Sequence, residues 1–247
     1  MQDWLVPDWP APPNVRARVS LRGSPGVSLA PWDRCNLGSR CGDDPAAVAA
    51  NRAGLVGALG LPAIPCWLHQ VHGVEVALVD RVDSAAEPVA DAAMTAQAGR
   101  VLAVLTADCL PVLLCRADGS AVAAAHAGWR GLAAGVLEAA CDALGSSDRE
   151  VLAWLGPAIG AASYEVGDEV REAFVRIDAA AEAAFAPTRP GHWTCDLYTL
   201  ACQRLAARGV SGVHGGGFDT LTDPRFYSYR REARTGRFAS LVWMGSS

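Results

Sequence analysis

Residues 101–144 read VLAVLTADCLPVLLCRADGSAVAAAHAGWRGLAAGVLEAACDAL, and this stretch decides the fold of the chain. Two apolar runs, Val101–Thr106 and Leu110–Leu114, predict buried strands, and the Asp118-Gly119 pair after them is typical of a turn. A third apolar run, Ala121–Ala125, predicts another strand. Apolar residues then recur every three to four positions as far as Leu144, which predicts a helix.

Polar and reactive side chains interrupt this stretch only where the apolar runs end. Asp108-Cys109 separates the first two runs, and His126 follows the third. Gly128-Trp129-Arg130-Gly131 predicts a loop that leads into the helix. We therefore expect Cys109 and His126 to emerge where strands meet loops.

The rest of the chain continues the alternation of strands and helices. Cys66–Val76 predicts two short strands with His72-Gly73 at the turn, and alternation puts Gln70 and His72 on one face. Asp33–Asp44 is a polar loop of the kind that often carries function, and Gly156–Gly160 predicts another loop. Further strands are expected at Val15–Leu21 (edge strand or hairpin), Val151–Leu155 and Ser240–Met244, and helices at 45–59, 166–185 and 197–208, the last ending at Gly209.

Length and composition limit the class of protein. A chain of 247 residues that is 51% hydrophobic suits one large domain or two small ones sharing a core, and we see no linker, so a single domain over 1–247 is expected. The net charge of -5 and the lack of a basic run argue against nucleic-acid binding. Neither a signal peptide nor a run of about 18 apolar residues is present, so we expect a cytoplasmic protein with no membrane contact, monomeric by default.

The residue types that carry chemistry narrow the mechanisms. All 21 basic residues of the Lys plus Arg count are arginine, which excludes a lysine Schiff base, pyridoxal phosphate and a P-loop. Eight cysteines without a C-x-x-C pair or a secretory signal are expected to be reduced. No G-x-S-x-G elbow exists, so His214–Gly217 predicts a flexible turn and not an oxyanion loop.

Three residues suggest a metal site. Of five histidines, His72 and His126 fall where predicted strands end, as Cys109 does. Two imidazoles and one thiolate can hold zinc and leave a fourth position for water or substrate, and the metal lowers the pKa of that water. Copper can use the same ligands and would bring redox chemistry.

Two other interpretations of these residues stay open. Their spacing matches no short zinc motif, and a histidine after a strand is commonly a hydrogen-bonded core or turn residue. Alternatively, Cys109 is a nucleophile with His72 or His126 as its base, which is a cysteine hydrolase without metal.

Arg130 also has two interpretations. Its guanidinium and the neighbouring backbone N–H groups could bind an anion such as phosphate, or Arg130 could be a surface residue paired with an acid. Trp129 would stack on a base or cover the core. Arg230 and Arg231 likewise have two interpretations, as part of an anion site or as residues of a solvated face.

Several longer motifs carry a family resemblance. They are HQVHG (69–73), TADCLPVLL (106–114), AHAGWRGL (125–132), GPAIG (156–160) and YSYRREARTGR (227–237), with NLG (36–38), CGDD (41–44) and Asn51-Arg52. Together they resemble the bacterial YfiH family, known as polyphenol oxidase or peptidoglycan editing factor, over nearly the full chain. In that family the second histidine of HQVHG, the cysteine of ADC and the histidine of AHAGWRG form a catalytic zinc site, which implies that role for His72, Cys109 and His126.

The resemblance implies a fold and an activity. The fold is α/β (α+β), a layered sandwich of the YfiH-like type with mixed β-sheets flanked by helices. The activity is zinc-dependent phosphorolysis of adenosine, inosine and methylthioadenosine to free base and ribose 1-phosphate, with adenosine deamination and copper-linked polyphenol oxidation beside it. Purine nucleosides and phosphate are then the expected partners, and as candidate contacts to them we name Asn36, Gln70, Arg130 and Arg230.

One departure and two rival functions accompany the resemblance. Many relatives carry a cysteine where this chain has Gly217–Thr220, so no role of that cysteine transfers. One rival is a cysteine-type hydrolase or amidase that removes misincorporated L-serine from peptidoglycan precursors, which would survive chelators and be lost on thiol alkylation. The other is a non-catalytic metal-binding or redox accessory protein.

Overall fold

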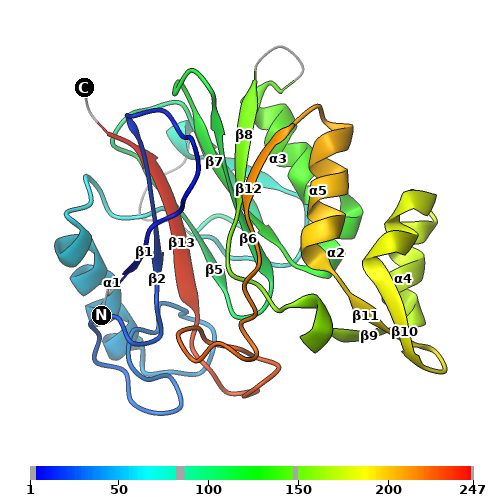
Figure 1. Ribbon diagram of the computed structural model, residues 1–247. Helices are drawn as coiled ribbons and strands as arrows, with labels where there is room; N and C mark the ends of the chain where they lie inside the picture. Colours follow the sequence, from blue (N-terminus) through cyan, green and yellow to red (C-terminus); the bar gives the residue numbers. More distant parts are fainter. Residues whose placement is uncertain (1–3, 82–86, 147–149, 246–247) are drawn as a thin grey trace.

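Two stacked β-sheets form the centre of the molecule, seen in a computed structural model that describes residues 4–81, 87–146 and 150–245 (Figure 1). The first sheet has the strand order β1-β2-β13-β5 and the second β12-β8-β6-β7-β4-β3. A small sheet, β10-β11-β9, lies at the side. The strands are β1 Trp4–Leu5, β2 Val15–Ser20, β3 Val76–Leu78, β4 Ala92–Thr95, β5 Val101–Thr106, β6 Leu110–Arg116, β7 Val122–Ala127, β8 Val151–Leu155, β9 Glu165–Gly167, β10 Phe185–Arg189, β11 His192–Cys195, β12 Gly212–Gly215 and β13 Phe238–Met244.

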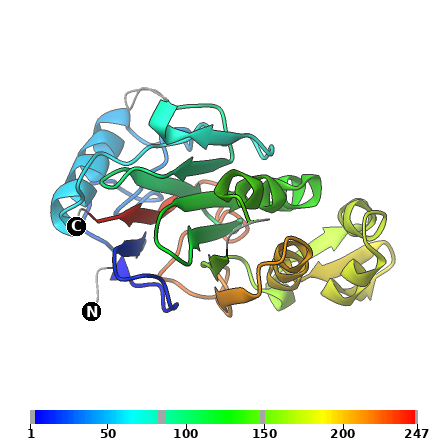
Figure 2. The same cartoon turned by 90° about the horizontal axis from the view of Figure 1, so that it is seen from above.

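Helices cover the outer faces of both sheets (Figure 2). On one side α1 packs on the four-stranded sheet, and on the other α2, α3 and α5 pack on the six-stranded sheet, with α4 beyond them. The helices are α1 Pro45–Leu59, α2 Trp129–Ala134, α3 Val136–Leu144, α4 Asp168–Val175 and α5 Leu197–Ala207, and the short 3-10 turns are η1 Val79–Arg81, η2 Ala161–Ser163 and η3 Ala179–Ala184. This is the mixed α/β sandwich that the sequence predicts. Among the described residues, no helix has both the length and the apolar character needed to cross a membrane.

The apolar runs are continuous because both sheets are buried on two faces. In β5, Leu102 and Val104 point between the sheets, while Val101 and Ala103 point toward α1. The strands β6 and β7 divide in the same way between the inter-sheet core and the core under the helices. The strands expected at 101–106, 110–114 and 151–155 are confirmed.

The region after β7 differs from the prediction. His126 lies inside β7, one residue before its end, and the helix begins at Trp129, so only Gly128 belongs to the connecting turn. The helix is also divided in two, because Gly135 has a φ of 107°, a left-handed conformation that glycine adopts without steric cost.

Cys66–Val76 does not form the two predicted strands. Single bridges at Cys66 and His69 and the strand β3 are all that forms. The reason is a buried carboxylate: the backbone N–H groups of residues 71–73 donate to Asp91 and are not available to a neighbouring strand.

Other corrections are local. The single helix expected over 166–185 is wrong: the segment is β9, α4, η3 and the start of β10, because Asp178 is extended and caps η3. His214 belongs to β12 and not to a flexible turn, and three left-handed glycines follow only from Gly215 onward. The strand expected at 15–21 pairs with β1 as in a hairpin, but it lies between β1 and β13 and is therefore not an edge strand. The helices expected at 45–59 and 197–208 are confirmed, as is the strand at 240–244.

Candidate metal centre and active-site cavity

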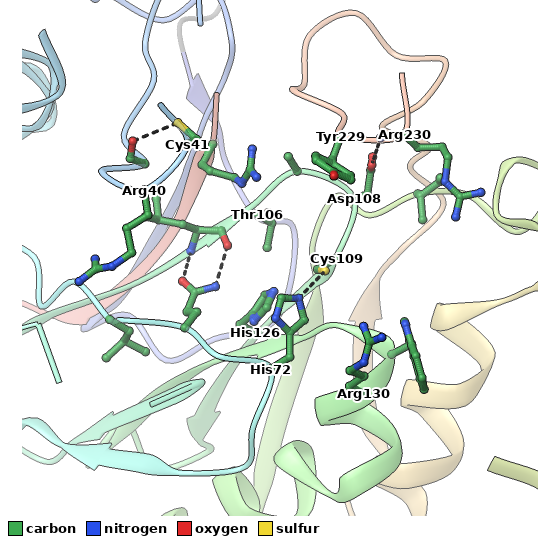
Figure 3. Close-up of a pocket in the computed structure, with 18 of the residues that line it drawn as sticks. Arg40, Cys41, His72, Thr106, Asp108, Cys109, His126, Arg130, Tyr229 and Arg230 are labelled. Carbon is green, nitrogen blue, oxygen red and sulfur yellow. Dashed lines mark hydrogen bonds between the residues drawn. The ribbon is translucent and has the colours of Figure 1, made fainter. Parts of the chain in front are cut away.

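His72, Cys109 and His126 lie together at the end of the two-sheet core (Figure 3). Cys109 sits in the turn between β5 and β6, His126 in β7, and His72 in the loop before β3. Their ligand atoms all lie within 4.8 Å of one another, and Cys109 Sγ is 3.8 Å from His72 Nε2. The three residues that the sequence singles out therefore meet in one cluster.

Two of the backbone positions in this cluster are left-handed. His72 has a φ of 63° and Asp108 a φ of 99°, conformations that side chains other than glycine rarely adopt. The Asp108 carboxylate accepts from the Thr220 hydroxyl at 2.7 Å and from the Arg230 backbone N–H at 2.7 Å. The Asp108 carbonyl accepts from Ile159 N–H at 2.9 Å. Asp108 thus ties two loops, one through Ile159 and the other through Thr220 and Arg230, to the turn that carries Cys109.

Asp91 organises both histidines. It is fully buried at the start of β4, and its carboxylate accepts from the N–H groups of residues 71–73 at 2.7–3.0 Å. The same carboxylate accepts from His126 Nδ1 at 2.8 Å. These hydrogen bonds lower the pKa of Asp91 although burial opposes its ionisation. Because Nδ1 is occupied, His126 is left with Nε2 to bind a metal.

The metal-free cluster is an ion pair. Burial would raise the pKa of the Cys109 thiol, but the neighbouring His126 and His72 rings outweigh burial and lower that pKa to about 6. Burial would likewise lower the pKa of His126, but Cys109 and Asp91 raise it to about 9. Between these values Cys109 is a thiolate and His126 an imidazolium.

These residues fit a divalent metal with nitrogen and sulfur ligands. A tetrahedral zinc with bonds of about 2.0–2.3 Å separates its ligand atoms by roughly 3.3–3.6 Å. The atoms found here lie within 4.8 Å of one another, so no pair would need to approach by more than about 1.5 Å. Three ligands leave a position open, as in catalytic zinc sites. The same donor set accepts copper, so the identity of the metal stays a prediction.

The pKa of Cys109 predicts its reactivity in metal-free protein. Because only the thiolate is nucleophilic, alkylation of Cys109 by iodoacetamide should rise through a midpoint near pH 6 and level off above it. Cys202 is an exposed residue, but partial burial of its sulfur raises its pKa. Its alkylation rate should therefore still be rising at pH 8. Peptide mass spectrometry after timed alkylation measures both sites, and a Cys109 midpoint above pH 8 would contradict the ion pair.

A cavity of about 510 Å³ opens over the three ligands. Gln70, Arg130 and Arg230, three of the residues expected from the sequence to contact substrate or phosphate, line it together with Trp129 and Tyr164. Its volume lies in the range of sites for small molecules. The cavity wall also includes residues of the 38–41 loop and of the 229–237 loop, which stand on opposite sides of the triad in Figure 3.

Arg130 is the most available cation in the cavity. Its guanidinium lies 4.4 Å from the ring centroid of Trp129, and within the described part of the chain it makes no ion pair. Arg230, in contrast, donates to the Glu165 carbonyl at 3.0 Å and stacks over Tyr164. Arg231 is structural, because it donates to the carbonyls of Thr220, Leu221 and Phe226.

The side-chain amides of Gln70 and Asn36 form hydrogen bonds with other groups of the protein. Gln70 exchanges two hydrogen bonds of 2.8 Å with the Leu105 backbone and so fastens the loop of His72 to β5. Asn36 is buried, does not line the cavity, and bonds within the loop of residues 36–43 and to the backbone N–H of Arg237. A substrate role of Asn36 would therefore act through these loops.

Asp91 and Tyr164 are the main residues of the site that sequence reasoning missed. Asp91 stands in an otherwise apolar run, Val89-Ala90-Asp91-Ala92-Ala93, and a single acid in a buried segment is a signal that it has a partner. Tyr164 follows a loop with no local pattern, so only tertiary contacts place it in the cavity.

The chain matches one family over nearly its whole length. Residues 16–245 match the family described as multi-copper polyphenol oxidoreductase laccase. Among curated relatives, a purine nucleoside phosphorylase of Pseudomonas aeruginosa is 56% identical over 246 residues, covering 99% of each chain. One of Xylella fastidiosa is 55% identical over 98% of this chain and 96% of its own length. The purine nucleoside phosphorylase YfiH of Escherichia coli is 49% identical over 99% and 100%.

Solved structures agree with the fold. A protein of Neisseria meningitidis superposes with a TM-score of 0.93 at 42% identity, covering 99% of this chain and 100% of that one. The hypothetical protein YfiH of Bacillus licheniformis superposes with a TM-score of 0.86 at 27% identity, covering 93% and 92%.

Proposed function

This chain belongs to the YfiH family, matched as multi-copper polyphenol oxidoreductase laccase, and from that premise we propose that it is a metal-dependent purine nucleoside phosphorylase. Its substrates are adenosine, inosine and methylthioadenosine, which it converts with phosphate to the free base and a ribose 1-phosphate. We also propose that residues 1–247 act as one domain, which the extent of the family match supports.

One observation carries the proposal. The cavity brings the His72, Cys109 and His126 cluster together with the guanidinium of Arg130, which no acid neutralises among the described residues. Phosphorolysis needs an anion held beside a nucleoside, and an unpaired arginine next to a concave site of nucleoside size is suited to hold that anion.

The reaction requires a balanced exchange at the sugar carbon C1′. The bond from C1′ to the base nitrogen breaks, a bond from C1′ to a phosphate oxygen forms, and the departing base gains a proton. Zinc bound by the three ligands would supply a Lewis acid at the cavity floor. Arg130 binds and orients phosphate, and Trp129, stacked on that guanidinium, limits where it can point. Gln70 and Asp91 keep His72 in place.

Replacing Arg130 tests the phosphate site. Arg130→Ala should keep its metal and raise the KM for phosphate by at least about tenfold, since a hydrogen bond to a charged group contributes about 1.5–3 kcal/mol. Turnover of inosine against phosphate concentration measures this, with metal content determined on the same sample.

A matched control is Arg208→Ala. Arg208 is exposed at the C-terminal end of α5, pairs with Asp142 of α3 and does not line the cavity. It should leave the KM for phosphate unchanged. A wild-type KM for phosphate in Arg130→Ala would remove Arg130 from the phosphate site.

Adenosine deamination is a second proposed activity of the same centre. The metal cluster in the cavity favours it, since zinc sites of this kind activate water. It is separable from phosphorolysis because ammonia release from adenosine requires no phosphate. Polyphenol oxidation would need copper at this cluster, and metal analysis followed by a phenol assay tests it.

The two rival functions make different predictions from the same site. A cysteine hydrolase of peptidoglycan precursors would use the Cys109 thiolate and would keep its activity in chelator. An accessory protein would bind metal and turn over no nucleoside. Activity on inosine that is lost in chelator and restored by zinc excludes both.

A further inference from the structure

One carboxylate contacts both histidines of the candidate metal site. Oδ1 of Asp91 accepts from His126 Nδ1 at 2.8 Å and from the His72 backbone N–H at 2.9 Å. Oδ2 accepts from the N–H groups of Val71 and Gly73 at 3.0 and 2.7 Å. Four donors from two distant segments thus converge on a side chain that is fully buried.

We propose that Asp91 is a positioning residue that sets both histidine ligands at once, so that the site is already formed before metal binds. This inference rests on the metal site of the proposed function, but not on the reaction carried out there.

The contact with His126 determines which nitrogen faces the metal. A histidine that donates Nδ1–H to a carboxylate presents Nε2 as the ligand and keeps its ring orientation. Asp91 holds the backbone of the same residue as well, because the His126 N–H donates to the Asp91 carbonyl at 2.7 Å. Asp91 therefore holds both the His126 ring and the backbone of the strand that carries it.

The contact with the 71–73 loop determines where His72 stands. His72 has a φ of 63°, which is unfavourable for a residue with a side chain, and something must compensate for it. The three consecutive N–H groups that this turn directs inward are all satisfied by the Asp91 carboxylate. Among the described residues these three N–H groups have no backbone acceptor that could replace the Asp91 carboxylate. Without Asp91, His72 would therefore lose its fixed position.

A simpler account is that Asp91 merely satisfies buried amides. Asp219 does this elsewhere: its carboxylate accepts from the N–H groups of Gly160 and Leu221 at 3.0 Å and from the Ser163 hydroxyl at 2.5 Å. No histidine contacts Asp219 among the described residues. Both aspartates therefore satisfy buried amides, but only Asp91 also contacts a histidine of the candidate metal site.

The test compares Asp91→Asn with Asp219→Asn in the full-length protein. In Asp91→Asn one oxygen becomes an NH₂ group, so two of the four donors lose their acceptor whichever way the amide lies. We expect the Kd for zinc, measured by competition with a chromophoric chelator, to rise about 10- to 100-fold. Asp219→Asn should lower the melting temperature and leave the Kd for zinc as in the wild type.

The outcomes separate this inference from the function proposed above. Wild-type zinc affinity in Asp91→Asn would overturn the positioning role, and so would an equal loss of affinity in both variants. A wild type that binds no zinc would overturn the metal site itself. Turnover is not part of the readout, so a failure to phosphorolyse nucleosides would leave the positioning role as measured.

A second measurement needs no variant and covers the case in which Asp91→Asn does not fold. Hydrogen exchange of the backbone amides of residues 71–73 is followed in metal-free wild type. If the site is formed beforehand, these amides are protected at least about tenfold although Val71 and His72 are exposed in their side chains. Exchange at the rate of an unstructured peptide would show that metal, and not Asp91, orders the loop.

Discussion

Cys109→Ala should lose its metal and its nucleoside turnover together. Cys109 supplies the only sulfur of the cluster, and its lowered pKa makes it the anionic ligand that holds a divalent cation. Loss of a group that merely orients a ligand already weakens metal binding about 10- to 100-fold, so loss of a ligand should exceed that range. Metal content by mass spectrometry should fall from about one zinc per chain to near zero.

The assay on the same samples decides between mechanisms. Adenosine and inosine are supplied with and without phosphate, and Cys141→Ala is the control, because Cys141 is a buried free thiol on α3 outside the cavity. Turnover by wild type that holds no metal would refute the metal-dependent mechanism and favour the cysteine hydrolase. Peptidoglycan precursors would then be the substrates to try.

Gly128→Ala should disturb the metal site through a single added methyl group. A Cβ at Gly128 would lie 2.8 Å from His72 Cδ2, which is closer than such atoms approach, and 3.0 Å from Cys109 Sγ, which is a tight contact. Because Asp91 holds the His72 backbone, the ring can move away only by rotating about its side-chain torsions, which would turn Nε2 out of its ligand position. We expect the Kd for zinc to rise by at least about tenfold, in the range found when ligands are misoriented.

Gly54→Ala provides the comparison for this substitution. Gly54 lies in α1, and a Cβ there meets no atom within 4 Å. Alanine in a helix is favoured over glycine by about 0.5–1 kcal/mol, so this variant should be slightly more stable and bind zinc as the wild type does. Equal zinc affinity in Gly128→Ala and Gly54→Ala would mean that the ligands have more freedom than the structure shows.

Different interactions position the residues of the proposed metal site and of the proposed anion site in this cavity. The candidate ligands are positioned by buried and partly buried hydrogen bonds, mainly those that Asp91 accepts from His72 and His126 and those that join Gln70 to Leu105. Among the described residues, Arg130 has stacking on Trp129 as its one side-chain contact and is otherwise exposed. A pre-formed metal site beside a more adaptable cation would let nucleosides with different bases share one phosphate position.

The mixed α/β fold and the three candidate ligands could be predicted from the sequence by itself. Buried strands must be apolar on both faces, so β5, β6 and β8 are visible as continuous apolar runs, and α1 is marked by the Asp44 cap and the Gly60 end. Cys109 and His126 were found because reactive side chains at the ends of such runs stand out. The same argument selected His72, and the family motifs then pointed to the same three residues with greater specificity than spacing allowed.

Only the tertiary structure decided how the site is held. Whether Cys66–Val76 forms strands depends on Asp91, which lies about twenty residues further along the chain and takes the amides that a strand partner would need. Asn36 and Gln70 look like substrate contacts in the sequence, yet their amides bond to loops and to β5. Local patterns show which face of a segment is buried, whereas the partner of a buried polar group is supplied by residues distant in the sequence. Here that partner is Asp91, which places His72 beside Cys109 and His126.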